Sequence, residues 1–305
     1  MKQLQFKHVL LIIVCLTANN IIAQSAGKSG LSFLKFGFGA RNIAMGDAGA
    51  SVSNDVTSLF YNPAKLANQT GNEILFMHNE WIQDVRSEVL GVRSDIAGIP
   101  LAIGLNVSTV SDIEVRGDSP GEPLSKFNAN FFFASLSTGF NILDKMSFGV
   151  TAKYIYEGIL VDEASGYAVD FGINYKTDFD GLSVAGVVKN IGSMNDLRSE
   201  ATKLPVEIRL GPAYTFSMEQ NKLDFVTALE FQKYTPTDDV HFNAGVEIVY
   251  DKTISLRGGY LSGYESKSFG GGVGLNWGSL SFDYAISPFA LEFGTGHSIS
   301  LSFKF

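Results

Sequence analysis

The residues that most often carry catalysis are few in this 305-residue chain, and their spacing does not form a recognisable site. Gly27-Lys28-Ser29 looks like the end of a phosphate-binding loop, but Ile22 stands where that loop requires its first glycine. The chain has four histidines, which are His8, His78, His241 and His297. None of them lies at the short spacing from another that metal motifs use. We therefore expect no enzymatic activity, no cofactor and no metal centre.

A group of acidic residues between positions 110 and 125 is the strongest candidate for binding a cation. Its members are Asp112, Glu114, Asp118 and Glu122. Carboxylates bind Ca²⁺, but these four lack the Asp-x-Asn-x-Asp-Gly order of a calcium loop. A solvated surface loop is the simpler interpretation.

Charge and cysteine content exclude two further classes of protein. The chain has 31 acidic and 23 basic residues and a formal net charge of −8, whereas nucleic-acid binding requires a basic face. We expect no nucleic-acid partner. The one cysteine, Cys15, lies in a segment that we expect to be removed, so the mature chain would have no thiol for disulfides, catalysis or metal binding.

The first 23 residues have the features of a secretory signal peptide. Lys2 and Lys7 give a positive start, residues 9–18 form an apolar run, and Ala23 is a small residue at the expected cleavage site. That run is about half of the roughly 20 residues that a membrane-spanning helix needs. Because Cys15 lies inside the run, lipid attachment to it is disfavoured. We predict export through a cleaved signal peptide of residues 1–23.

Residues 72–305 alternate between apolar and polar side chains, as strands with two different faces do. In the last segment Ile299, Leu301 and Phe303 alternate with serines. About fourteen such segments begin near residues 72, 87, 99, 126, 143, 165, 181, 204, 222, 239, 252, 267, 279 and 296. An even strand number is typical of bacterial outer-membrane barrels. The predicted fold is all-β: an antiparallel transmembrane β-barrel of about 14 strands, in contact with the lipid of the cell outer membrane.

The connections between these segments alternate in length. Residues 110–125 and 192–203 form long connections, whereas 94–97 and 141–144 form short ones. Outer-membrane barrels have short periplasmic turns and longer extracellular loops, so this alternation identifies the two ends. Aromatic residues near the segment ends predict girdles at the two membrane interfaces. These are Tyr175, Phe216, Tyr250, Trp277 and Phe305 on the periplasmic side, and Trp81, Tyr156, Tyr234 and Tyr260 on the other.

The polar faces of the segments carry charges of both signs. These residues are Lys153, Asp170, Glu207, Arg209, Glu230, Glu247 and Arg257. In a barrel they point inward to water, where opposite signs can pair.

Residues 24–71 do not alternate and precede the barrel. Ser53, Asn54 or Asp55 can cap a short helix over residues 56–61. Pro63 ends that helix, because the residue before a proline is pushed out of the α region. We predict a short helical N-terminal segment.

This segment also carries a resemblance to a known family. The matching residues are Ser32-Phe33-Leu34-Lys35, Gly39-Ala40-Arg41, Ala44-Met45-Gly46, Ala48-Gly49, Asp55, Asn62-Pro63-Ala64 and Leu66, with Lys189-Asn190-Ile191-Gly192 further along. Together with the layout of the chain, they resemble the PorV/PorQ family of outer-membrane proteins. That family is similar to the FadL-type transporters of hydrophobic compounds.

The resemblance implies a place in the outer membrane of the Bacteroidetes and related bacteria, and an association with the type IX secretion system. The implied partners are the type IX translocon and the C-terminal signal domains of exported cargo. A FadL-like passive transporter of hydrophobic small molecules is the alternative. Such a transporter needs an apolar pocket, which Phe33, Leu34, Phe36 and Phe38 could line.

The resemblance further implies that residues 24–71 form a plug inside a barrel of residues 72–305. The motif residues of this plug are Gly39, Ala40, Arg41, Met45, Gly46, Asp55, Asn62, Pro63 and Ala64. Among them, Arg41 and Asp55 could pair with charges of the lumen. The final Phe305 resembles the signal by which the barrel-assembly machinery recognises its clients.

Overall fold

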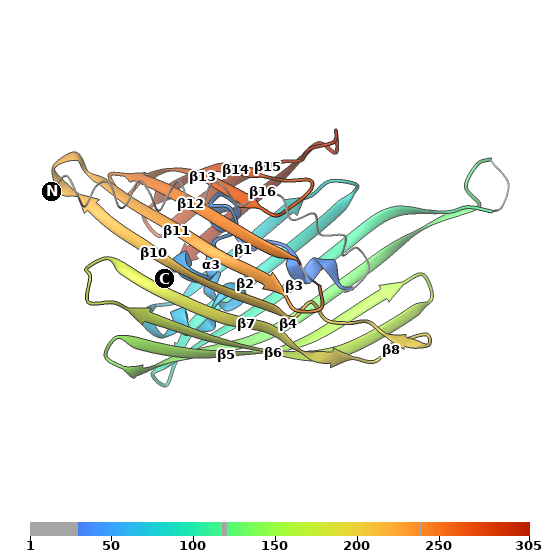
Figure 1. Cartoon of the computed structure of the whole chain (residues 1–305), viewed down its shortest axis with the longest axis horizontal. Coiled ribbons are helices and arrows are strands. Elements are labelled where there is room, and N and C mark those ends of the chain that lie inside the picture. The colour runs from blue at the N-terminus through green and yellow to red at the C-terminus, as the bar shows by residue number, and fades with distance from the viewer. Residues whose placement is uncertain (1–29, 118–120, 238) are drawn as a thin grey trace.

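Fourteen strands close into one antiparallel barrel in a computed structural model that describes residues 30–117, 121–237 and 239–305 (Figure 1). The barrel strands are β1 (Glu73–Glu80), β2 (Val85–Ile96), β3 (Ile99–Val115), β4 (Ser125–Leu143), β5 (Met146–Ile159), β6 (Asp162–Lys176), β7 (Leu182–Met194), β10 (Glu207–Met218), β11 (Leu223–Tyr234), β12 (Val240–Tyr250), β13 (Ile254–Ser262), β14 (Phe269–Trp277), β15 (Leu280–Pro288) and β16 (Thr295–Lys304). The predicted fold class is confirmed. The predicted signal peptide, Gly27-Lys28-Ser29 and Asp118 lie outside the described residues.

The barrel closes between its first and last strands. Each strand pairs with the one before it in the chain, β10 follows β7, and β1 pairs with β16 over the whole of its length. Closure satisfies the backbone hydrogen bonds of both edge strands, which lipid could not do. A small separate hairpin of β8 (Asp196–Leu197) and β9 (Glu200–Ala201) lies in the connection between β7 and β10.

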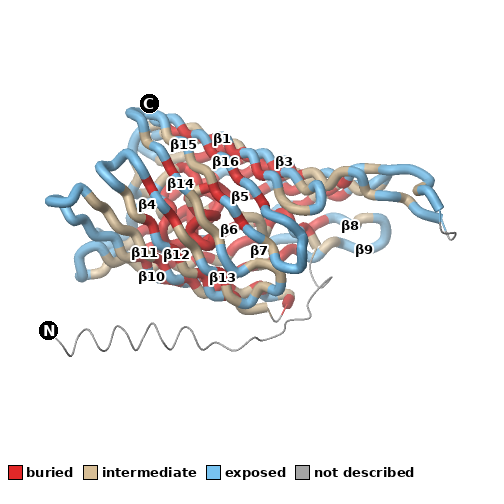
Figure 2. The backbone as a smooth tube through the Cα atoms, turned by 90° about the horizontal axis from the view of Figure 1, so that it is seen from above, coloured by how far each residue is buried: buried red, intermediate tan, exposed pale blue. Residues whose placement is uncertain are grey.

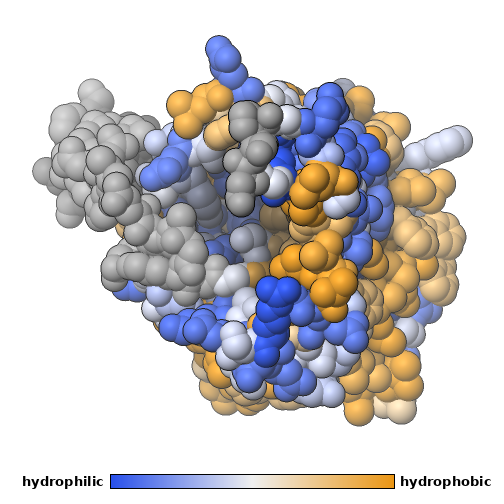
Figure 3. Space-filling model, turned by 90° about the vertical axis from the view of Figure 1, so that its right-hand side faces the viewer, coloured by the Kyte–Doolittle hydropathy of each residue, from blue (hydrophilic) through white to orange (hydrophobic). Residues whose placement is uncertain are grey.

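Side chains along each strand point alternately into and out of the barrel. In β13, for example, Leu256 is 62% exposed, whereas its neighbour Arg257 is 6% exposed. Buried residues therefore gather in the middle of the molecule, as Figure 2 shows. Apolar residues cover much of the outer wall at the right of Figure 3, and hydrophilic residues gather at the end that faces the viewer. This division suits a wall with lipid outside and polar groups inside.

Two strands extend well beyond the others at one end of the barrel. β3 and β4 are 17 and 19 residues long, and their hairpin projects from the body at the right of Figure 1. Part of the predicted long loop over residues 110–125 is thus strand, because β3 continues to Val115 and β4 begins at Ser125. The other end has short turns, such as residues 97–98 between β2 and β3, so it is the periplasmic end.

The described residues before the barrel form five short helices. They are the 3-10 helix η1 (Ser32–Lys35), the α-helices α2 (Ala40–Ala44), α3 (Gly49–Val52) and α4 (Ser58–Tyr61), and the 3-10 helix η2 (Pro63–Asn68). α4 ends at Asn62, whose extended backbone (φ −150°, ψ 100°) is the conformation predicted for a residue before proline. A last 3-10 helix, η3 (Glu219–Asn221), lies in the turn between β10 and β11. Within the described residues, no helix has both the length and the hydropathy that crossing a membrane would require.

These N-terminal helices lie inside the barrel and contact different sides of its wall. η2 packs on β4, β5 and β6, α3 packs on β7, β10 and β11, and α2 packs on β13 to β16. We call residues 31–68 the plug. Its first residues lie at the extracellular end, where the Gly30 amide donates to the Lys203 carbonyl, and its last helix leads into β1 at the periplasmic end.

Tyr234, a member of the predicted aromatic girdles, does not face the membrane, and the ring of Trp81 packs on Phe36 of the plug at 5.7 Å. Tyr234 is 4% exposed, and its hydroxyl accepts a hydrogen bond from Gln232 Nε2 at 2.7 Å. The girdle prediction is therefore wrong for this residue, because Tyr234 falls on the inward parity of β11. Tyr175 and Trp277 are exposed on the outer wall.

Candidate functional site in the barrel lumen

The plug motif is held by backbone contacts that only small residues permit. Gly39, which precedes α2, has φ +81°, and the amide of Ala40 donates to Ser300 Oγ of β16 at 2.8 Å. Gly46 has φ +68°, and a Cβ on it would lie 2.7 Å from the carbonyl oxygen of Ala244 in β12. Larger residues at these positions would push the plug away from the wall.

Inward-facing glycines of the wall complete this fit. A Cβ on Gly149 of β5 would lie 2.2 Å from the amide nitrogen of Ala64, and one on Gly172 of β6 would lie 2.0 Å from Asn62 Oδ1. Asn62 Nδ2 also donates to the carbonyl of Ile173 at 3.1 Å. Sequence reasoning missed these wall glycines. Their signal was a glycine inside a strand, which often marks the close approach of another backbone.

Arg41 of the plug binds the wall through an ion-pair chain. Its guanidinium lies 2.6 Å from Glu247 Oε2 of β12, Glu247 Oε1 lies 2.6 Å from Arg257 Nε of β13, and Arg257 reaches Asp283 of β15 at 2.6 Å. Burial acts to lower the pKa of Arg41, but the Glu247 carboxylate outweighs burial and keeps that pKa above its usual value. Asp55 contacts the plug itself, because its carboxylate accepts from the Thr57 amide at 2.9 Å.

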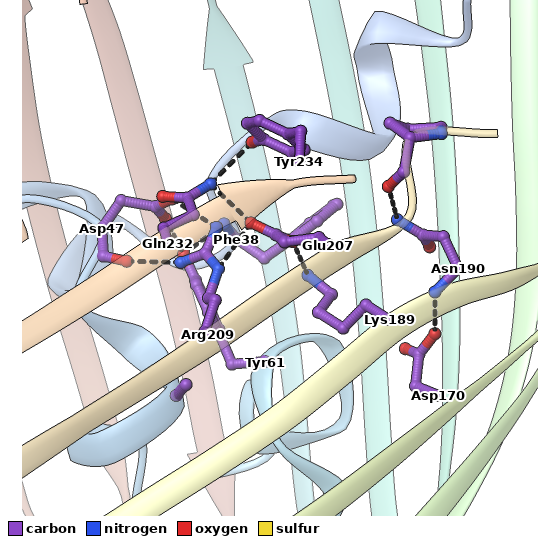
Figure 4. A network of polar contacts seen from close by, with 12 residues as sticks. Phe38, Asp47, Tyr61, Asp170, Lys189, Asn190, Glu207, Arg209, Gln232 and Tyr234 are labelled. Atoms are coloured by element: carbon purple, nitrogen blue, oxygen red, sulfur yellow. Dashed lines mark hydrogen bonds and ion pairs between the residues drawn. The ribbon is translucent and has the colours of Figure 1, made fainter. Parts of the chain in front are cut away.

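A second chain of charges centres on Arg209 of β10, shown in Figure 4. Its guanidinium lies 2.7 Å from Glu207 Oε1, 3.4 Å from Glu230 Oε2 and 3.0 Å from Asp47 Oδ2. Asp47 belongs to the plug, and its backbone carbonyl also accepts from Arg209 at 2.7 Å. Glu230 in turn accepts from the Ala50 amide of α3 at 3.0 Å. One arginine therefore joins two strands of the wall to the plug.

A third group connects neighbouring strands of the wall. Lys153 of β5 lies 2.7 Å from Asp170 of β6, and its amino group donates to Asn190 Oδ1 of β7 at 2.8 Å. The Asn190 amide donates to Asp170 at 2.8 Å, where the register of β6 and β7 shifts. Asn190 has φ +61°, a conformation that asparagine tolerates better than most residues. Next to it, Lys189 lies 3.3 Å from Glu207 and so connects this group to the second chain.

All seven predicted lumen charges thus take part in ion pairs, but in a different environment from the one expected. Each of them is 6% exposed or less, because the plug fills the space that water was expected to occupy. Sequence reasoning missed Asp47, although it directly follows the motif glycine Gly46. Lys189 was also missed as a lumen charge. Among the described residues, no three acidic, histidine or cysteine side chains come together as a metal site requires.

Phe305, the predicted assembly signal, lies at the periplasmic end of the closing seam. Its ring stacks on Phe303 at 5.6 Å and its side chain is exposed, while its amide donates to the Asn72 carbonyl at 3.0 Å. The terminal residue is therefore held by the chain just before β1.

The described acidic residues near position 112 do not come together as a cation site requires. Asp112 lies 3.2 Å from Lys126, and Glu114 lies 2.7 Å from Arg116. The first pair connects β3 to β4, whereas the second joins Glu114 of β3 to the residue just after that strand. Close to the tip of the projecting hairpin, Leu124 is 74% exposed.

A closed 14-stranded barrel with an apolar outer wall and a lumen filled by N-terminal helices defines a plugged outer-membrane barrel. Residues 20–239 match the family model described as PorV, type IX secretion system protein PorV. This match covers more than half of the chain, so the protein belongs to the PorV family.

Solved structures share the fold at low sequence identity. The toluene transporter TodX of P. putida is 12% identical, with a TM-score of 0.63, and the match covers 88% of this chain and 99% of TodX. The monoaromatic hydrocarbon channel CymD is 13% identical, with a TM-score of 0.60, and the match covers 88% of this chain and 98% of CymD. No match was found among curated proteins.

Proposed function

We propose that this PorV-family barrel binds type IX secretion partners, either the translocon or the C-terminal domains of cargo, through its extracellular end. The observation that carries this proposal is the β3–β4 hairpin, which extends beyond the barrel wall and presents the exposed side chain of Leu124 close to its tip. An apolar side chain held out in water on a projecting hairpin, together with those on other connections at the same end, favours a protein partner.

The extracellular end offers further contacts of the same kind. Leu160 and Val161 form the turn between β5 and β6 and are 58% and 80% exposed. Leu291, in the connection between β15 and β16, is 74% exposed. These side chains lie on connections beyond the ends of the strands. They support a surface for protein binding at the end of the barrel.

The packing of the lumen argues against the alternative, passive transport of hydrophobic molecules. Phe33 and Phe38 are each 3% exposed. The ring of Phe33 stacks on Phe131 at 5.3 Å, and that of Phe38 stacks on Phe60 at 4.6 Å. These rings fill the position where a transporter would need an open apolar pocket. At 12% and 13% identity, the likeness to TodX and CymD shows the fold alone. It does not support transport of their substrates by this chain.

A photo-crosslinking amino acid at position 124 tests the proposal in intact cells. We expect it to crosslink to a secretion component or to exported cargo. The matched control is position 179, which is 63% exposed but lies in the periplasmic turn between β6 and β7. Crosslinks at 179 but not at 124, or none at either site in secreting cells, would overturn the role of the β3–β4 hairpin.

Export and assembly complete the proposed function. Residues 1–23 are a signal peptide that is cleaved on export. Residues 24–71 form the N-terminal segment that contains the plug. Residues 72–305 are inserted by the barrel-assembly machinery, which recognises Phe305. Deleting Phe305 tests the last step, and we expect a loss of heat-modifiable migration in gels. Unchanged migration and surface exposure would remove Phe305 from this role.

A further inference from the structure

The periplasmic mouth of the barrel contains a cavity that the secretion role at the other end does not use. It has a volume of about 420 Å³. Its wall is formed by the periplasmic ends of β1, β2, β6, β7 and β16, and its inner side is formed by the end of the plug. The cavity therefore lies inside the ring of strands and opens toward the periplasm.

Positive charge dominates the lining of this cavity. Among its described lining residues, Lys65, Arg93, Lys176 and Lys304 are cationic and Glu73 is the one carboxylate. Arg93 already has a partner, because it lies 2.7 Å from Asp95. The four cations thus face only Glu73 and Asp95, so the lining keeps an excess of positive charge, and three of the cations are lysines.

Two of these lysines donate to neutral partners in the described structure. Lys65 Nζ donates to the carbonyl of Ser51 at 2.5 Å, and Lys176 Nζ donates to Asn68 Oδ1 at 2.8 Å. Burial lowers the pKa of Lys65 to about 8, and the guanidinium of Arg41 adds to this effect. An anion in the cavity would stabilise the protonated amino group.

The cavity also contains buried acceptors that have no hydrogen-bond partner. They are Gln69 Oε1, Glu73 Oε1 and Asn174 Oδ1, and the donor Arg93 Nε beside them is unpartnered as well. Glu73 and Asn174 are 5% and 4% exposed. A buried polar atom without a partner is costly, so these atoms indicate a ligand that donates hydrogen bonds.

We propose that this cavity binds an acidic peptide segment of a periplasmic partner. A peptide of this kind supplies carboxylates for the three lysines and amide N–H groups for the unpartnered acceptors. Inorganic phosphate at neutral pH carries one or two O–H groups, fewer than the three unpartnered acceptors, so it could satisfy the lysines but not all of the acceptors. The position inside the ring of strand ends also suits an extended chain entering from the periplasm better than a lipid in the surrounding membrane.

The test uses the full-length purified barrel in detergent and a fluorescent peptide of alternating aspartate and glycine, with binding followed by anisotropy. The wild-type protein should bind this peptide, and an asparagine–glycine peptide should not compete. Each of Lys176→Ala and Lys304→Ala removes a charge-assisted hydrogen bond and should weaken binding about tenfold. The matched control is Lys222→Ala, a periplasmic-turn lysine that pairs with Asp251 at 2.9 Å and does not line the cavity.

Asn174→Ala separates ligand binding from a structural role. Because Asn174 Oδ1 has no partner in the described structure, its removal should not lower the urea midpoint of unfolding, yet it should weaken peptide binding. Three results would overturn the proposal. They are no binding by the wild-type protein, equal weakening by Lys222→Ala, and displacement of the peptide by inorganic phosphate or anionic lipid vesicles at equal concentration.

Discussion

The two faces of the same strands follow different rules. On β13, Leu256 points outward and needs only to be apolar, whereas its neighbour Arg257 points inward and contacts both Glu247 and Asp283. Lipid accepts many apolar side chains, so the outer face tolerates exchange among them. The inner face is specific, because each buried charge depends on one or two named partners.

Glycine shows the same contrast. Gly149 faces inward, where a Cβ would meet the plug backbone at 2.2 Å, whereas the nearest atom to a Cβ on Gly258 of β13 would be 3.9 Å away. The inner face is therefore constrained in shape as well as in charge. Because the chain itself already occupies the lumen, binding of partners at the ends of the barrel is consistent with the structure.

The largest effect should come from removing the central inward charge. Arg209→Met leaves Glu207, Glu230 and Asp47 without their shared partner, and should cost about 3–5 kcal/mol of unfolding free energy. The control is Arg86→Ala on the outer side, whose contact with Glu80 is exposed and 3.7 Å long, and which should change stability little. Urea titration in lipid vesicles measures both. Equal losses for the two variants would contradict the distinction between the faces.

The next effect comes from placing a charged side chain on the outer face. Val273→Arg places a cation in lipid and should cost about 2–4 kcal/mol near the middle of the membrane. Asn276→Arg, on the inward parity of the same strand, should be mild. The same titration compares them. If both variants fold and insert equally well, the assigned parity of β14 is wrong.

A smaller effect separates the faces by shape alone. Gly149→Ala forces the plug from the wall and should cost about 1–3 kcal/mol, as overpacking of a filled core does. Gly258→Ala should be neutral, since its new methyl group would make only an ordinary van der Waals contact with Val246 Cγ1 at 3.9 Å. Limited proteolysis of the plug provides a second measurement, in which only the Gly149 variant should become sensitive. Resistance in that variant would mean that the plug adjusts without cost.

A last effect is a dependence of stability on pH. Burial lowers the pKa of Lys65 from 10.5 to about 8, so the folded protein holds this proton less tightly than the unfolded chain. The resulting cost is fully present below pH 8 and disappears as the pH rises toward 10.5. Wild-type stability should therefore rise relative to Lys65→Met across that window, as urea midpoints at several pH values will show. A constant difference between the two proteins would contradict the buried state of this lysine.

The contrast between faces also explains what the sequence could predict. Period-two alternation indicates on which face of its strand each residue lies. The number of strands, their approximate starts and the set of inward charges could therefore be predicted from the sequence. The partner of each charge was not, because it depends on register and on where the plug lies. Arg209 and Asp47 are 162 residues apart in the chain. The prediction for Tyr234 was wrong for a related reason. It used the position of Tyr234 at the end of a strand and did not consider on which face of the strand the residue lies.

The central claim is that this plugged barrel acts in secretion through protein partners at its extracellular end. Affinity purification of the tagged protein from outer membranes in mild detergent, followed by mass spectrometry, tests it most directly. We predict recovery of a large translocon barrel, or of exported proteins that share a C-terminal signal domain. Recovery of the barrel alone, with a bound lipid or another hydrophobic ligand, would contradict the claim and favour the transporter.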